Sequence, residues 1–97
     1  MTGNLKFVVD NNVGKLAKWL RMMGYDTLLF SGSDDWEMVR TALDEGRVIL
    51  TRDTQIMRRG VITSGRLKAV LIRKEEPEQQ IQQVIETLNL GRQFRPF

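Results

Sequence analysis

The sequence contains no cysteine and no histidine. Without cysteine, the chain has neither disulfide bonds nor thiolate ligands for a metal ion, and this absence fits a cytoplasmic protein. Without histidine, it has no imidazole general base, no catalytic triad built on histidine and no histidine-liganded zinc site. Any chemistry that the protein carries out must therefore use carboxylates.

Long apolar runs are also missing. No run approaches the ~18 residues that a membrane-spanning helix needs, and the apolar stretch near the N-terminus is too short for a secretory signal peptide. We therefore expect a cytoplasmic protein with no membrane association. The 15 basic and 12 acidic residues give a net charge of +3. This balance weakly indicates a polyanionic partner such as nucleic acid, and it is also ordinary for a soluble surface.

Short apolar runs alternate with amphipathic segments, and we interpret the chain as one domain covering residues 1–97. Strands are predicted at 5–9, 27–30, 48–51 and 69–72. Helices are predicted at 13–23, at 35–45 and from Pro77 onward, and residues 53–68 are predicted to be irregular. Strands of continuous apolar residues indicate an α/β fold in which helices cover both faces of a parallel sheet. The second and third strands are expected on either side of the first, in the order 2-1-3-4.

Aspartates follow or flank the carboxyl ends of the predicted strands, where open parallel sheets bind their ligands. Asp10 comes directly after the first apolar run, and Asp53 comes two residues after the third. Asp34 precedes Glu37 by three positions, so we interpret Asp34 as the N-cap of the second helix. Asp35 instead shares the core-facing side of that helix and should lie beside the same edge of the sheet.

Asp10, Asp35 and Asp53 are therefore expected to converge on one crevice. Three anions raise each other's pKa unless a cation lies among them, and a cluster of oxygen ligands suits Mg²⁺ or Mn²⁺. Such ions activate water and stabilise the charge on a phosphodiester that is being cut.

Each of these aspartates also has a local alternative role. Asp10 could open a turn or cap the following helix, and Asp53 could cap a short turn over 54–57. Asp35 could simply complement the dipole of its helix.

Basic side chains accompany the predicted acid cluster. Lys15 shares the polar side of the first helix with Lys18 and Arg21, and it would reach a phosphate near the sheet edge best. Four more basic residues lie in the irregular segment: Arg58, Arg59, Arg66 and Lys68. A solvated helix face and a solvated loop explain both groups equally simply. Asn11, directly after Asp10, could hold a metal-bound water or a phosphate oxygen, or only form a turn.

Two stretches, KFVVDNNVGKLAKWLRMMGYDTLLF (6–30) and SDDWEMVRTALDEGRVILTRDTQI (33–56), resemble the Mut7-C family of PIN-like ribonuclease domains. The resemblance implies a PIN-like three-layer α/β/α sandwich with a central parallel sheet of about four strands. It implies a metal-dependent endoribonuclease in which Asp10, Asp35 and Asp53 are the catalytic, metal-binding acids. Thr51 would orient the site, and Arg52 would contact phosphate or lock the end of the strand. The predicted substrate-binding residues are Asn11, Lys15, Thr51, Arg52, Arg58 and Arg59.

The resemblance also bears on cofactors and partners. Mg²⁺ or Mn²⁺ would be the cofactor and RNA the substrate. Members of the family often continue into a cysteine-bearing zinc ribbon, which we expect this chain to lack because it has no cysteine. The open alternatives are a non-catalytic module that binds RNA or a protein partner, a homodimer, and the toxin subunit of a toxin–antitoxin pair.

Overall fold

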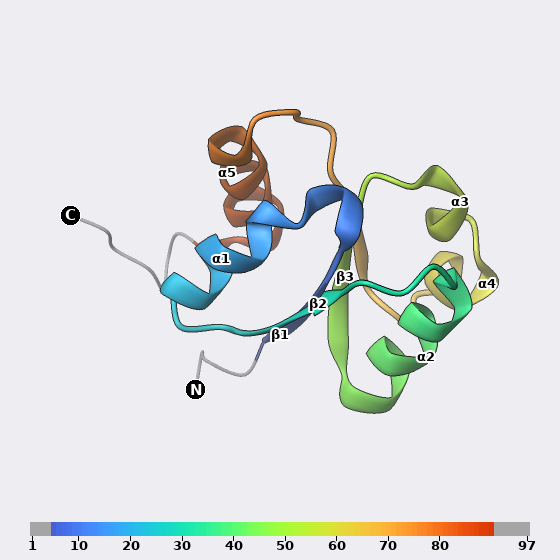
Figure 1. Cartoon of the computed structure of the whole chain (residues 1–97). Coiled ribbons are helices and arrows are strands. Elements are labelled where there is room, and N and C mark those ends of the chain that lie inside the picture. Colours follow the sequence, from blue (N-terminus) through green and yellow to red (C-terminus); the bar gives the residue numbers. More distant parts are fainter. Residues whose placement is uncertain (1–4, 91–97) are drawn as a thin grey trace.

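The computed structural model describes residues 5–90 of the chain. Its strands are β1 (Lys6–Asp10), β2 (Asp26–Phe30), β3 (Arg47–Thr51) and β4 (Ala69–Leu71). They form one parallel sheet in the order β2-β1-β3-β4 (Figure 1). The predicted strands and their order are therefore confirmed, and β1 and β3 are the central strands.

Helices cover both faces of this sheet (Figure 1). The 3-10 helix η1 (Asn11–Val13), α1 (Lys15–Met22) and α5 (Pro77–Leu88) lie on one face. On the other face lie α2 (Asp35–Glu45), α3 (Thr54–Met57) and α4 (Gly60–Thr63). This arrangement is the predicted three-layer α/β/α sandwich.

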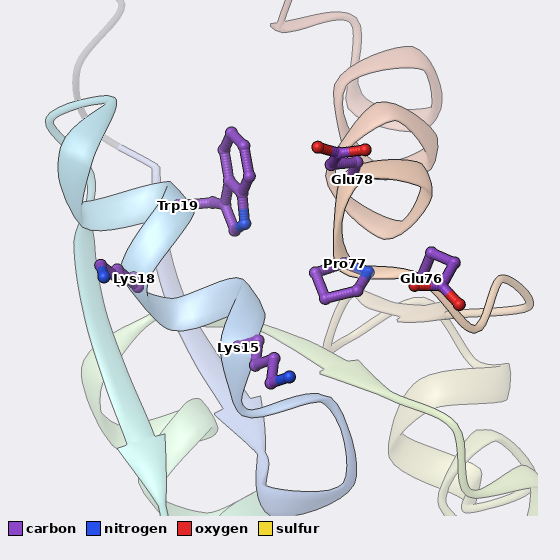
Figure 2. A pocket seen from close by; sticks show the side chains of 6 residues that line it. All are labelled: Lys15, Lys18, Trp19, Glu76, Pro77 and Glu78. Atoms are coloured by element: carbon purple, nitrogen blue, oxygen red, sulfur yellow. The ribbon is translucent and has the colours of Figure 1, made fainter.

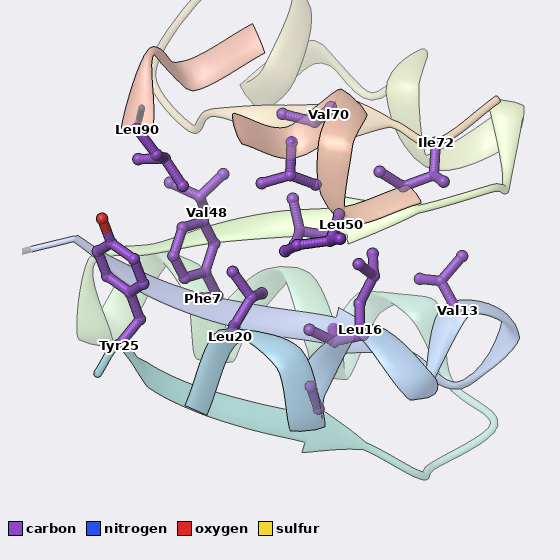
Figure 3. Close-up of a cluster of buried hydrophobic side chains, with 14 residues drawn as sticks. Phe7, Val13, Leu16, Leu20, Tyr25, Val48, Leu50, Val70, Ile72 and Leu90 are labelled. Carbon is purple, nitrogen blue, oxygen red and sulfur yellow. The ribbon is translucent and has the colours of Figure 1, made fainter. Parts of the chain in front are cut away.

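Two hydrophobic cores, one on each face of the sheet, hold the layers together. In β1, Phe7 and Val9 belong to the core under α1 and α5, while Val8 belongs to the core under α2. Figure 3 shows the first core, where the rings of Phe7 and Tyr25 meet edge-on with centroids 5.4 Å apart. Because a central strand is buried on both faces, its sequence is a continuous apolar run instead of an alternating one.

The ends of α2 follow directly from its sequence. At the start, the Asp34 carboxylate accepts a hydrogen bond from the Trp36 backbone N–H at 2.9 Å, as an N-cap does. At the end, Gly46 has φ +68°, a left-handed conformation that glycine adopts without steric cost. The predicted span of this helix and the role of Asp34 are therefore confirmed, and Asp35 is the first helical residue.

The prediction of an irregular segment over 53–68 was wrong. Two short helices, α3 and α4, occupy much of it. Ile56 of α3 and Leu67 after α4 are buried in the core under α2. Helices of four residues are too short to show a hydrophobic period, so the sequence pattern could not reveal them. The final stretch after Leu90, predicted to continue past the last helix, lies outside the described residues.

The second predicted strand lies at an edge of the sheet and is partly exposed. β2 pairs only with β1 and forms an edge of the sheet, and its Leu28 and Leu29 are 37% and 38% exposed. Arg21 of α1 covers part of this edge, because its Nε donates to the Thr27 carbonyl at 3.1 Å. Within residues 5–90, no helix combines the length and apolar character that crossing a bilayer requires.

Candidate functional site

The central strands β1 and β3 deliver two aspartates to the same edge of the sheet. Thr51, the last residue of β3, is fully buried, and its hydroxyl donates to Oδ2 of Asp10 at 2.7 Å. The same hydroxyl oxygen accepts from the backbone N–H of Asp53 at 3.0 Å. One buried hydroxyl therefore links the acid that ends β1 to the acid that follows β3.

Asp10 and Asp53 differ in their local roles. Asp53 is the N-cap of α3, and its Oδ1 accepts from the Gln55 backbone N–H at 2.8 Å; the capping alternative for this residue is confirmed. Asp10 occupies the N-cap position of η1, but within the described chain its side chain makes no capping hydrogen bond there. Its carboxylate is bound across the sheet by Thr51 instead.

Asp35 brings the third carboxylate to this edge from the N-terminus of α2. Its pKa is raised because the carboxyl group is partly desolvated by burial and lies near the charge of Asp53. The Asp35 and Asp53 carboxyl groups also lie within hydrogen-bonding reach, and the charge of Asp10 acts in the same direction. The structure thus brings the side chains of these aspartates into one electrostatic group from three separate segments.

Arg59 is the cation of this group. It lowers the pKa of Asp35 in opposition to the other aspartates, and its guanidinium carbon lies 5.4 Å from the ring centroid of Trp36. A guanidinium over an indole ring is held by a cation–π interaction. Arg59 was predicted as a substrate contact, but its pairing with α2 could not be predicted, because no local pattern connects positions 36 and 59.

The donor atoms at this edge fit a hard divalent cation by their chemistry. Carboxylate oxygens are the ligands that Mg²⁺ prefers, and this ion is usually bound by one or two carboxylates, waters and substrate phosphates. Over residues 5–90, however, no group of three or more Asp, Glu, His or Cys side chains is arranged to hold a metal ion. The aspartates are therefore neighbours without forming a closed cage, and the metal site stays a prediction.

Arg52 locks the end of β3 to the segments on either side. Its Nη1 donates to the Lys74 carbonyl, in the loop before α5, at 2.6 Å. Its backbone N–H donates to Oδ1 of Asn12, in η1, at 3.3 Å. Of the two roles predicted for Arg52, locking the strand end is the one that these contacts support.

The remaining predicted substrate-binding residues have exposed side chains. Asn11 and Lys15 are exposed and line a hollow of about 480 Å³ between η1 and the start of α5. Lys15 also lines an adjoining hollow between α1 and α5 (Figure 2). Arg58 is exposed between α3 and α4. No hydrogen bond recorded among residues 5–90 joins these residues to the aspartates, and their role in substrate binding stays a prediction.

Comparison with known proteins adds to this geometry. Residues 5–97 match the model of the Mut7-C RNAse domain. Searches among curated proteins and among solved structures gave no match. The family description indicates a nuclease-type function for a chain whose aspartates gather at the carboxyl edge of a parallel sheet. Since the match covers nearly the whole sequence, the chain belongs to the Mut7-C RNAse domain family.

Proposed function

We propose that this protein is a metal-dependent endoribonuclease that cleaves RNA phosphodiesters. Asp10, Asp35 and Asp53 would bind Mg²⁺ or Mn²⁺ at the carboxyl edge of the sheet. The family supports a ribonuclease, and the absence of histidine and cysteine leaves carboxylates as the groups for phosphodiester hydrolysis.

The observation that carries the proposal is the environment of Asp35. Its pKa is raised by burial, by the neighbouring Asp53 and by Asp10. A fold gains no stability from placing like charges together, and perturbed carboxylates in such a position are typical of functional sites. A divalent cation would remove this repulsion, because each carboxylate would then face a positive charge.

Each residue has a defined task in the proposed reaction. Asp10, Asp35 and Asp53 would hold Mg²⁺ or Mn²⁺, which would supply an activated water and neutralise charge on the scissile phosphate. Thr51 fixes the carboxylate of Asp10 through its hydroxyl and the position of Asp53 through the backbone N–H. Arg59, held over Trp36, is a cation close enough to the acids to bind a phosphate oxygen.

Two neighbouring aspartates offer a matched test of the proposal. Asp35→Asn removes a predicted ligand, whereas Asp34→Asn removes one charge from the adjacent position and keeps a good N-cap residue. Mn²⁺ should raise the unfolding midpoint of the wild type and of Asp34→Asn in a dose-dependent way, because ligands of the native state stabilise it. Asp35→Asn should lose both this rise and the cleavage of single-stranded RNA.

If the wild type showed neither the rise in its unfolding midpoint with Mn²⁺ nor RNA cleavage, the alternative of a non-catalytic RNA-binding module would be favoured. The lack of a closed three-ligand group in residues 5–90 is the observation on its side. Such a module would bind RNA with a strong dependence on salt concentration. Its unfolding midpoint would not change with Mn²⁺, and it would not cleave RNA. Asp35→Asn would bind RNA at least as tightly as the wild type.

A further inference from the structure

A hollow between α1 and α5 lies beside the candidate site and takes no part in the proposed acid chemistry. It has a volume of about 550 Å³, within the range of ~300–1,000 Å³ typical of ligand pockets. Its lining residues are Lys15, Lys18, Trp19, Glu76, Pro77 and Glu78 (Figure 2). We infer that this hollow is a guanine-selective subsite for single-stranded RNA, with Trp19 stacking on the base and Glu78 binding its edge. The inference rests on the proposal that RNA is the substrate.

Trp19 supplies the stacking surface. Leu16 and Leu20 of the same helix are fully buried, whereas Trp19 is 36% exposed. In Figure 2 its ring projects from α1 into the gap toward α5. An indole face at the wall of a hollow can stack on any base, and such stacking contributes about tenfold to a hundredfold in affinity per base.

The charges around the ring favour a base over a phosphate. The hollow carries two acidic and two basic side chains, so its net charge attracts no phosphate to the ring. The carboxylates of Glu76 and Glu78 accept hydrogen bonds from donors on a base. Guanine presents two adjacent donors on its Watson–Crick edge, N1–H and the N2 amino group. Adenine and cytosine present one amino donor beside an acceptor nitrogen, and uracil presents one N–H between two carbonyls. Glu78, which lies across the gap from Trp19 in Figure 2, therefore favours guanine.

A second hollow connects this subsite to the acid edge. It shares Lys15, Glu76 and Pro77 with the first hollow and extends to Asn11, which directly follows Asp10. Lys15 lies where the two hollows meet, one helical turn (~6 Å along the axis) before Trp19. Its ammonium group can neutralise a phosphate between the stacked base and the bond that is cut. A single-stranded RNA bound along both hollows would place its guanine to one side of the cleaved phosphodiester.

Hydrogen bonds hold the loop before α5, which carries one side of the subsite, against the end of β3. Gln80, which is 5% exposed, donates from Nε2 to the carbonyls of Lys74 at 3.0 Å and Glu75 at 3.3 Å. Arg52 donates to the same Lys74 carbonyl from the other side. These bonds fix the loop that leads into Glu76 and Glu78, so less ordering is needed when a ligand binds.

Tryptophan fluorescence can test this assignment without any cleavage. The chain has two tryptophans, so Trp36→Phe leaves Trp19 as the single reporter. In EDTA, a tetranucleotide with one guanine should quench Trp19 and bind about tenfold more tightly than its inosine counterpart, which lacks the N2 amino group. Glu78→Gln should abolish this preference, whereas Glu86→Gln, on the same helix but outside the hollow, should keep it.

Two results in the comparison of oligonucleotides would overturn the inference. One is equal binding of the guanine, inosine, adenine and uracil oligonucleotides, and the other is a guanine preference that survives Glu78→Gln. Trp19→Ala should weaken binding about tenfold or more, and Trp19→Phe, which keeps an aromatic face, should retain most of it. Unchanged binding by Trp19→Ala would also overturn the inference, and thermal unfolding of each variant establishes that it is folded.

The same experiments separate the subsite from the proposed catalysis. Guanine-selective binding in EDTA together with no cleavage in Mn²⁺ would retain the subsite and reject the nuclease proposal. Cleavage in Mn²⁺ with no base preference in binding or in the cut positions would reject the subsite and retain the nuclease. Lys15→Gln should weaken the binding of all the oligonucleotides alike. It should also reduce the slope of log affinity against log salt concentration by about one phosphate contact.

Discussion

The two ends of the parallel sheet hold their charged groups in opposite ways. At the amino end, Arg47 of β3 donates to Glu45 at 2.6 Å and to Asp26 at 3.0 Å, and also to the Phe7 carbonyl at 3.0 Å. The Arg47 side chain is only 10% exposed. Each of these contacts places the positive charge of Arg47 against an acceptor, so the Arg47 guanidinium is electrostatically satisfied.

At the carboxyl end, like charges face one another. Asp35 lies near Asp53 and Asp10, and Arg59 is the cation that opposes them. The pKa shifts show the contrast. Burial alone would lower the pKa of Arg47, but its bonds to acidic partners outweigh burial and raise it, which favours the charged form. Burial and neighbouring acids raise the pKa of Asp35, which disfavours the charged form.

In the proposed function, the charges at the amino end serve the fold and the acids at the carboxyl end serve catalysis. Paired charges at the amino end tie β3 to the start of β2 and to the β1 backbone. The acids at the carboxyl end repel one another in the folded state, and in the proposed function a cation or a substrate would relieve this repulsion. Substitutions at the two ends should therefore have opposite effects on stability and activity.

The largest effect is expected from Asp10→Asn on RNA cleavage. Loss of one of the carboxylates that we propose to bind the metal should reduce the rate by about a hundredfold to a thousandfold, or roughly 3–4 kcal/mol. Stability should change little, because the Thr51 hydroxyl can donate to the asparagine oxygen as it does to Asp10. Single-turnover cleavage in Mn²⁺, beside thermal unfolding, measures both quantities. Full activity in this variant would remove Asp10 from the site.

The next effect is expected at the amino end, from Arg47→Met. The change removes the bonds to Glu45, Asp26 and the Phe7 carbonyl while keeping the length of the side chain. We expect the free energy of unfolding to fall by about 2 kcal/mol, with cleavage by the folded protein unchanged. Urea unfolding gives the first value. A loss of activity without a loss of stability would contradict the contrast between the two ends.

A smaller effect is expected from Thr51→Val, an almost isosteric change at a fully buried position. The Asp53 backbone N–H and the Asp10 carboxylate each lose a partner. We expect the free energy of unfolding to fall by about 1–2 kcal/mol, and cleavage to fall because both acids lose their positions. Thr51→Ser keeps the hydroxyl and serves as the control; it should retain most of the activity.

The smallest expected effect is an increase in stability, whereas the preceding substitutions lower stability or activity. In the absence of divalent ions, Asp35→Asn should raise the free energy of unfolding at neutral pH by about 0.5–1 kcal/mol, because it removes like-charge repulsion. The raised pKa means that folded Asp35 binds a proton more readily than unfolded Asp35 does. As the pH falls through the folded pKa, the free energy of unfolding of the wild type should therefore approach that of Asp35→Asn.

This pH dependence gives the last measurement. Below the ordinary aspartate pKa of ~3.9, the side chain is neutral in both states and the difference between wild type and Asp35→Asn should vanish. Thermal unfolding from pH 7 to pH 3.5 follows the difference, and Asp34→Asn is the matched control. A variant that is less stable than the wild type at neutral pH would show that Asp35 is favourably paired.

Local sequence patterns determined most of the architecture. Continuous apolar runs identified the strands, and the N-cap Asp34 with the left-handed Gly46 set both ends of α2. The helical face of Asp35 distinguished it from its neighbour. These inferences succeed because hydrogen bonding within a helix and burial on both sides of a strand leave a direct mark on the order of residues.

Other features depended on the tertiary structure alone. The α3 and α4 helices are too short to show a period, and the exposure of β2 follows from its place at the edge of the sheet. The contacts of Arg59 with Trp36 and of Arg52 with Lys74 join positions separated by more than twenty residues. The hollow beside Trp19 exists because α1 and α5 pack side by side. The sequence by itself determined the four strands, the longer helices α1, α2 and α5, and the acids that lie at their ends. Only the packing of those elements decided which side chains meet, because contacts between distant segments leave no periodic signal in the chain.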